Sequence, residues 1–154
     1  MKTVISTPNA PGAIGPYSQG YAFGDLVITS GQIPVDPATG AIPEGIAAQA
    51  EQSCKNVGAI LEAAGVTLES VVKTTCFLAD MGDFAAFNEV YAKYFTSKPA
   101  RSCVAVRELP KGVLCEIEAI AEKYAEESSN TLPCGVTVFA VTPHFYAQSG
   151  RGKP

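Results

Sequence analysis

The hydrophobic residues near the start of the chain fall into two short β-prone runs, residues 17–23 and 26–30. The dipeptide between the two runs is Gly-Asp, which is typical of the tight turn that joins two antiparallel strands. The pattern therefore predicts a β-hairpin, and its pairing brings Tyr17 close to Gly31. The Pro- and Gly-rich segment before the hairpin, residues 6–16, is expected to be irregular.

Two later segments change to the period of a helix. In residues 47–64 the apolar positions follow steps of four and three, which is one face of a helix, and Gly65 is a suitable terminator. A second helix is expected at about 83–95, with Asp80 or Asp83 as its N-cap. The apolar face of the first helix consists of Ala50, Cys54, Val57, Leu61 and Ala64, and that of the second of Phe84, Phe87, Tyr91 and Phe95.

Three further β-rich runs complete the pattern, at residues 71–79, 101–107 and 113–121. The last two flank the turn sequence Leu-Pro-Lys-Gly at 109–112 and are expected to form a second hairpin. Elements in this order predict an α+β fold, in which a mixed sheet has two helices packed on one face. Strand 113–121 has apolar residues on both of its sides, so we expect the uncovered face of the sheet to mediate self-association.

The second hairpin is where candidate chemistry gathers. With its turn centred between residues 109 and 110, Cys103 faces Glu116. In the same register Arg101 faces Glu118, so all four side chains are expected in one patch. One interpretation is a surface salt bridge, which contributes little to stability. The other is a carboxylate-binding arginine, whose planar fork suits a bidentate contact, beside an acidic side chain that activates water.

The remaining candidate positions each have a structural and a functional interpretation. Tyr17 is either a core aromatic residue or part of a ligand site. Ser30 and Gly31 end a strand, where a glycine marks a bulge or lets a ligand approach the bare backbone. Cys103 is interpreted as a small buried hydrophobic residue, because residues 1–123 contain no histidine that could activate it as a nucleophile. Asn88 is assigned to the helix surface or to an interface and not to catalysis.

Composition and charge exclude several classes of protein. The net charge is −4, which argues against nucleic-acid binding, and the longest apolar run is far shorter than the ~20 residues of a membrane span. The five cysteines are odd in number and form no C-x-x-C pair, so we expect reduced thiols in a cytoplasmic protein without a zinc site. The single histidine, His144, excludes a histidine-based metal site or a Ser-His-Asp triad from residues 1–123.

The pattern divides the chain into two parts. Residues 1–123 contain every predicted element and are expected to form one domain of ordinary size. Residues 124–154 show no helical or alternating pattern that would connect them with the core. They are therefore interpreted as a C-terminal appendage that is poorly ordered.

The chain resembles the Rid (YjgF) family of enamine/imine deaminases from its N-terminus to about Glu122. Four blocks in the same order make the resemblance specific, whereas any one of them alone would be weak. The blocks are Gly15-Pro16-Tyr17-Ser18-Gln19-Gly20, Ile28-Thr29-Ser30-Gly31-Gln32-Ile33-Pro34, Pro99-Ala100-Arg101-Ser102-Cys103-Val104 and Glu116-Ile117-Glu118-Ala119-Ile120-Ala121.

The resemblance implies a fold, an assembly and a reaction. The fold is a chorismate-mutase-like α+β fold, and the assembly is a homotrimer with a site in each cleft between subunits. The reaction is the hydrolytic deamination of 2-aminoacrylate and 2-iminobutanoate, which pyridoxal-phosphate-dependent dehydratases release, to 2-oxo acids and ammonia. The resemblance implies no cofactor, and we expect no metal site.

The resemblance also implies roles for individual residues. Arg101 matches the arginine that binds the substrate carboxylate, and Glu116 matches the glutamate that positions the attacking water. Tyr17 matches a tyrosine that lines the site. Ser30, Gly31 and Cys103 match family positions that contact the ligand, partly through their backbone atoms.

Two alternative functions remain open. A trimeric ligand-binding or regulatory protein would use the same arginine, but it would have no need for Glu116. A ribonuclease or translation inhibitor also exists in the broader family, and the acidic charge and the missing histidine argue against it. The segment between Phe95 and Arg101 is shorter than in many family members, and its length bears on the shape of the cleft rim and therefore on the size of the substrate.

Overall fold

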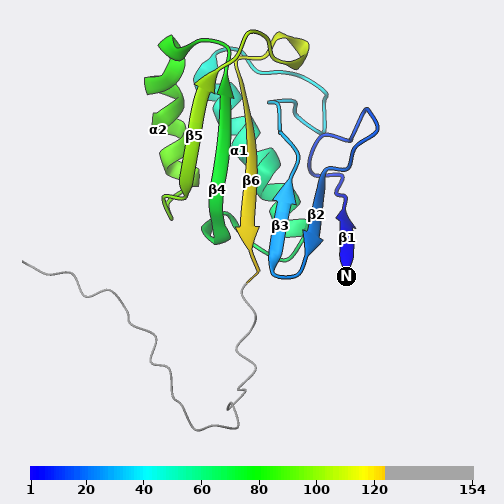
Figure 1. Cartoon of the computed structure of the whole chain (residues 1–154). Helices are drawn as coiled ribbons and strands as arrows, with labels where there is room; N and C mark the ends of the chain where they lie inside the picture. The colour runs from blue at the N-terminus through cyan, green and yellow to red at the C-terminus, as the bar shows by residue number, and fades with distance from the viewer. Residues whose placement is uncertain (124–154) are drawn as a thin grey trace, which may run out of the picture.

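A computed structural model describes residues 1–123 of the chain (Figure 1). The predicted appendage, residues 124–154, lies outside the described residues. The strands are β1 (Lys2–Ile5), β2 (Gly20–Phe23), β3 (Leu26–Thr29), β4 (Val71–Leu78), β5 (Ala100–Ala105) and β6 (Cys115–Glu122). The helices are α1 (Ile46–Ala63) and α2 (Phe84–Tyr94), and short 3₁₀ turns occur at Leu68–Ser70, Met81–Asp83 and Pro110–Gly112.

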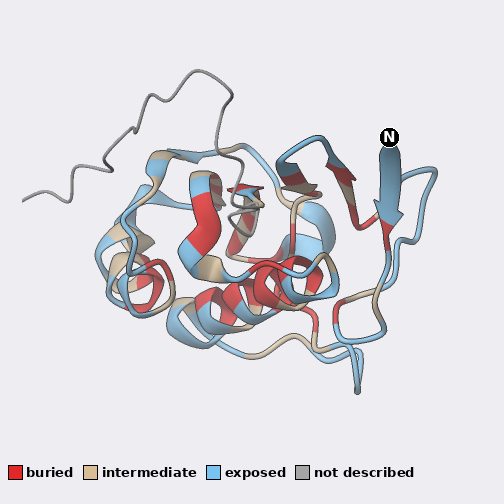
Figure 2. Ribbon diagram, turned by 90° about the horizontal axis from the view of Figure 1, so that it is seen from below, coloured by how far each residue is buried: buried red, intermediate tan, exposed pale blue. Residues whose placement is uncertain are grey.

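The strands form one mixed sheet in the order β1-β2-β3-β6-β4-β5. The pairing of β4 with β5 is parallel, and every other pairing in the sheet is antiparallel. Both helices pack on the same side of the sheet (Figure 2), which confirms the predicted α+β architecture. Within residues 1–123 no helix lies over the opposite side, so this part of the chain leaves one sheet face uncovered.

The core lies between the helices and the sheet, where the predicted apolar faces are buried. On α1 the side chains of Ala50, Cys54, Val57 and Leu61 are 0% exposed, and on α2 that of Phe87 is also 0% exposed. Alternate residues of β6 face the helices and are at most 1% exposed, namely Cys115, Ile117, Ala119 and Ala121. Burying each larger apolar side chain contributes about 1.5–3 kcal/mol, which makes this layer the main source of stability.

The first predicted hairpin is confirmed. Phe23 pairs with Leu26, Gly24 adopts the left-handed conformation with φ 53°, and the Ser30 N–H donates to the Gln19 carbonyl at 2.8 Å. The additional strand β1, which pairs with β2, is not anticipated from the sequence because only four residues contribute to it and three of them are exposed.

The second predicted hairpin is wrong. β5 and β6 are not neighbours, because β4 lies between them, antiparallel to β6 and parallel to β5. The turn sequence at 109–112 changes the direction of the chain, but such a local signal does not select the strand with which β5 pairs. The connection through α2 makes β4 and β5 a parallel β-α-β unit, which occupies that edge of the sheet.

Candidate active site

Arg101 and Glu116 lie on opposite faces of the sheet within one chain. Arg101 is the register partner of Thr74 on β4, and Thr74 is fully buried beneath α2. Glu116 is the register partner of Phe77. Because side chains alternate along a strand, Phe77 and Glu116 point to the uncovered face, whereas Thr74 and Arg101 point to the helices.

The same division separates the other two members of the expected patch. Cys103 pairs with the buried Cys76 and faces the helices, whereas Glu118 pairs with Thr75 and faces the uncovered side. The expectation that Arg101, Cys103, Glu116 and Glu118 share one patch is therefore wrong. A six-stranded sheet with β4 in the middle creates two half-sites, one on each face.

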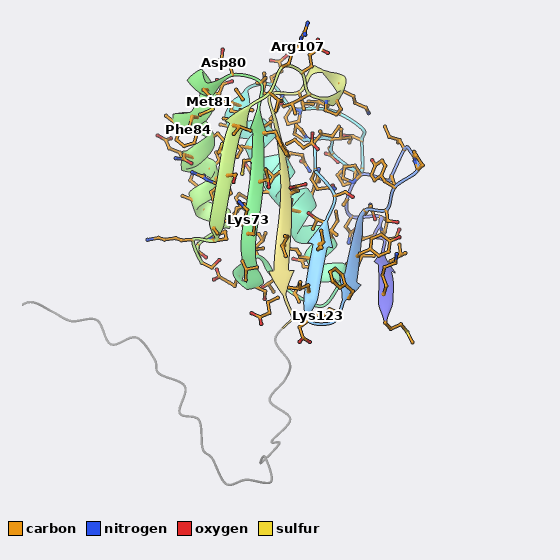
Figure 3. All side chains as sticks on the ribbon, viewed as in Figure 1. Lys73, Asp80, Met81, Phe84, Arg107 and Lys123 are labelled. Carbon is orange, nitrogen blue, oxygen red and sulfur yellow. The ribbon has the colours of Figure 1, made fainter. Side chains whose placement is uncertain are left out.

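The first half-site is built around Arg101. Its Nη1 donates to Asn88 Oδ1 at 2.6 Å, and its guanidinium carbon lies 4.7 Å from the centre of the Tyr91 ring and 5.5 Å from that of Phe84. Both distances are within the range of a cation–π contact. An open groove of about 620 Å³ lies beside the guanidinium, and its lining includes Asn88, Tyr91, Phe95, Thr96, Lys98 and Arg101. Phe84 lies at the first residue of α2 (Figure 3) and does not line the groove.

The helix that supports Arg101 is fixed to the sheet by a buried polar contact. The Tyr91 hydroxyl and Thr74 Oγ1 lie 2.7 Å apart, and burial raises the pKa of Tyr91, a change that the hydrogen bond with Thr74 partly opposes. The contact of Asn88 with Arg101 was not anticipated from the sequence. Its signal is the spacing of Phe84, Asn88 and Tyr91, because residues three and four positions apart share one side of a helix.

The second half-site is built around Glu116, whose carboxylate lies directly over Gly31. A Cβ atom added at Gly31 would overlap the Glu116 side chain, so only glycine permits this approach. Gly31 also lines a cavity of about 240 Å³ together with Tyr17 and Lys111. Tyr17 and Gly31 therefore line the same cavity, and Glu116 reaches this region through its contact with Gly31.

Three buried amide side chains hold the irregular segments around this cavity. Gln19 accepts from the Thr7 N–H at 2.7 Å and donates to the carbonyls of Thr7, Ala10 and Pro11. The second amide, Gln32, donates to the carbonyls of Ser30 and Gly31, and the third, Asn56 of α1, donates to those of Ile33 and Val35. These contacts were not predicted from the sequence pattern, since a buried amide has no periodic signal.

Ser30 and Cys103 have structural contacts of their own. The Ser30 hydroxyl donates to the Ser18 carbonyl at 2.6 Å, which connects the segment of Tyr17 with the end of β3. Cys103 packs against the core from the edge strand, and burial raises the pKa of its thiol although Arg101 opposes the change. A thiol in this state is a weak nucleophile, in agreement with its interpretation as a packing residue.

Glu116 has the electrostatic properties of a proton acceptor. Burial raises the pKa of its carboxyl above the ordinary value of 4.5, and the negative charge of nearby Glu118 raises it further. A base with a raised pKa holds a proton more readily, which suits it to accept one from water during a reaction. Residues 1–123 contain no group of three or more His, Cys, Asp or Glu side chains that could hold a metal ion.

None of the helices in residues 1–123 has the length and apolar character needed to cross a membrane.

Comparisons with known proteins agree with the four sequence blocks. The family model described as endoribonuclease L-PSP matches residues 7–123. A curated relative from Salmonella typhimurium, named 2-iminobutanoate/2-iminopropanoate deaminase, is 58% identical over 125 residues, which cover 79% of this chain and 98% of the relative. A protein of the same name from Escherichia coli is 56% identical over the same shares of the two chains.

Solved structures show the same fold. The structure of E. coli TdcF with bound serine has a TM-score of 0.77 and 51% identity, and the match covers 79% of this chain and 98% of that one. The structure of the E. coli YjgF gene product has a TM-score of 0.76 and 55% identity, over 78% and 98% of the two chains. The chain therefore belongs to the endoribonuclease L-PSP family, and within it to the Rid (YjgF) proteins that its sequence blocks resemble.

Proposed function

We propose that this protein hydrolyses reactive 2-imines, such as 2-iminobutanoate and 2-iminopropanoate, to 2-oxo acids and ammonia. The observation that carries the proposal is the pairing of chemistries in the two half-sites. The first half-site provides the guanidinium of Arg101, which contacts the neutral side chains of Asn88 and Tyr91. The second provides the partly buried carboxyl of Glu116, whose pKa is raised. The names of relatives that are 56–58% identical support the same reaction.

In the proposed mechanism Arg101 binds the substrate carboxylate with its planar fork. The backbone around Gly31 and Cys103 completes the binding site, and Ser30 and Tyr17 shape its wall. Glu116 holds a water at the carbon of the C=N bond. The same carboxylate then accepts a proton as the water oxygen bonds to that carbon.

The product of this attack is a tetrahedral carbinolamine. The proton that Glu116 accepted passes to the nitrogen, and the hydroxyl proton follows it as the C–N bond breaks, so ammonia leaves and the C=O bond of the 2-oxo acid forms. Substrate, water and products balance without any redox step. Positioning the water and transferring one proton are sufficient contributions, because imines of this kind also hydrolyse in free water.

The proposed site lies between subunits of a homotrimer. Arg101 and Glu116 are separated by the sheet in one chain, so a single subunit cannot present both to one small substrate. Self-association is also supported by the uncovered sheet face, where Val72 and Val104 are 45% and 46% exposed. We place the reaction in the cytoplasm, where the free thiols of Cys54, Cys76, Cys103 and Cys115 would stay reduced.

A non-catalytic ligand-binding protein is the competing function. It would explain Arg101, but it gives no reason for a carboxyl with a raised pKa held over a glycine. E. coli TdcF binds serine in its crystal structure, and a small amino acid would be a ligand for either function. Turnover is therefore the property that separates the two.

The test couples the protein to a pyridoxal-phosphate-dependent threonine dehydratase and follows 2-oxobutanoate above the uncatalysed rate. We expect turnover by the parent protein and a fall in kcat of roughly 10²–10⁴ for Glu116→Gln, because this variant keeps the shape but loses the base. Glu62→Gln, at an exposed position of α1, is the matched control and should retain full activity. Absence of turnover by the parent protein, with binding of 2-oxobutanoate retained, would establish the ligand-binding alternative.

A further inference from the structure

We propose that Asn88 is a positioning residue that orients Arg101 through a neutral acceptor and so leaves the guanidinium charge free for the substrate carboxylate. The inference rests on the proposed function, in which Arg101 is the carboxylate-binding group. Asn88 lies outside the four sequence blocks, and the sequence pattern assigned it to a helix surface or an interface.

The geometry around Arg101 fixes its side chain with little loss of binding capacity. Asn88 Oδ1 accepts from Nη1 at 2.6 Å, while the guanidinium plane is supported by the ring of Tyr91 at 4.7 Å. A guanidinium has five N–H donors, and a single amide oxygen occupies one of them. The remaining donors can still make a bidentate contact with a carboxylate.

The neutrality of the acceptor is the important property. Within residues 1–123 the only ion pair joins Glu51 to Lys55, so Arg101 has no carboxylate partner in that part of the chain. Glu89 is next to Asn88 in sequence and also lines the groove, but it does not reach Arg101. A carboxylate at position 88 would bind the guanidinium by itself and would compete with the substrate.

The position of Asn88 is set by the buried contacts of α2. Phe87 precedes it and is 0% exposed, and Tyr91, three residues later, is anchored to Thr74 by the 2.7 Å contact between their hydroxyl groups. Asn88 itself is only partly buried. A substitution at position 88 is therefore expected to change the environment of Arg101 without removing core packing.

The experiment measures binding of 2-oxobutanoate by calorimetry, together with kcat and KM in the coupled assay. For Asn88→Asp we expect Kd and KM to rise roughly tenfold or more, because a new charged hydrogen bond competes with the ligand. The value of kcat should change far less, since the lost contact is present before and during the reaction. Ala85→Asp is the matched control, because it adds the same charge to an exposed position of α2 that does not line the groove.

The outcomes separate the inference from the proposed function. Unchanged Kd and KM in Asn88→Asp, with Arg101→Ala still unable to bind 2-oxobutanoate, would overturn the inference alone. Full binding by Arg101→Ala would overturn the assignment of Arg101 and the inference with it. If Asn88→Asp does not fold, Asn88→Ala takes its place: loss of orientation should raise KM by a smaller factor, and an unchanged KM in that variant would also overturn the inference.

Discussion

The division of the site between two faces of the sheet predicts that two inactive variants should restore activity when they are mixed. Arg101→Ala removes the proposed carboxylate-binding group, and Glu116→Gln removes the proposed base. If each site takes Arg101 from one subunit and Glu116 from the next, an intact site forms wherever a Glu116→Gln subunit supplies the arginine and an Arg101→Ala subunit supplies the glutamate. In rings assembled randomly from equal amounts, this arrangement occurs at about a quarter of the sites.

The magnitude can be sharpened by purification. If the two variants carry different affinity tags and only mixed trimers are retained, every trimer contains about one intact site in three, whichever variant is in excess within it. Activity is followed as 2-oxobutanoate released from a coupled threonine dehydratase, after subtraction of the uncatalysed rate. We therefore expect about 25% of the parental activity in the unfractionated mixture and about 33% in the mixed trimers.

A second mixture provides the matched control. When the parent protein is mixed with the double variant Arg101→Ala/Glu116→Gln, a site shared between subunits again gives about 25% activity, whereas a site within one chain would give about 50%. Trimers of the double variant alone should show only the uncatalysed rate. No recovery in the mixture of single variants, together with about 50% in the control, would refute the placement of the site between subunits.

Four further predictions follow from the geometry. Because burial and Glu118 raise the pKa of Glu116, kcat should rise with pH through a value above 4.5, and Glu118→Gln should shift this limb of the pH–rate profile to lower pH. The raised pKa of Glu116 also makes the free energy of unfolding depend on pH. Its contribution is fully present below the ordinary pKa of 4.5 and is lost as pH rises through the higher pKa of the folded state. Glu116→Gln should remove this pH dependence, which urea unfolding at several pH values measures. Gly31→Ala should fold normally by circular dichroism but lose activity roughly tenfold or more, because its Cβ displaces the Glu116 carboxylate; unchanged activity would contradict the contact. Phe87→Ala, at a position that is 0% exposed, should lower the free energy of unfolding by about 3–5 kcal/mol, and a loss below 1 kcal/mol in urea unfolding would contradict its placement in the core.

Local patterns in the sequence determined most of the elements. The apolar steps of four and three in α1 and α2 predict which side chains are buried, because a helix places residues of that spacing on one face. The Gly-Asp turn predicts the first hairpin and its register, because a two-residue turn leaves the flanking strands only one pairing. The side-chain types of Arg101 and Glu116 suit carboxylate binding and water activation, and these roles stay predictions.

The relation between these residues was decided only by the tertiary structure. The sequence places β5 and β6 on either side of a turn, and nothing local indicates that β4 inserts between them. Pairing of distant strands depends on how α2 packs across the sheet, which is a property of the whole core and not of a turn. That insertion places Arg101 and Glu116 on opposite faces, brings Asn88 to the guanidinium, and makes a second subunit necessary for the proposed site.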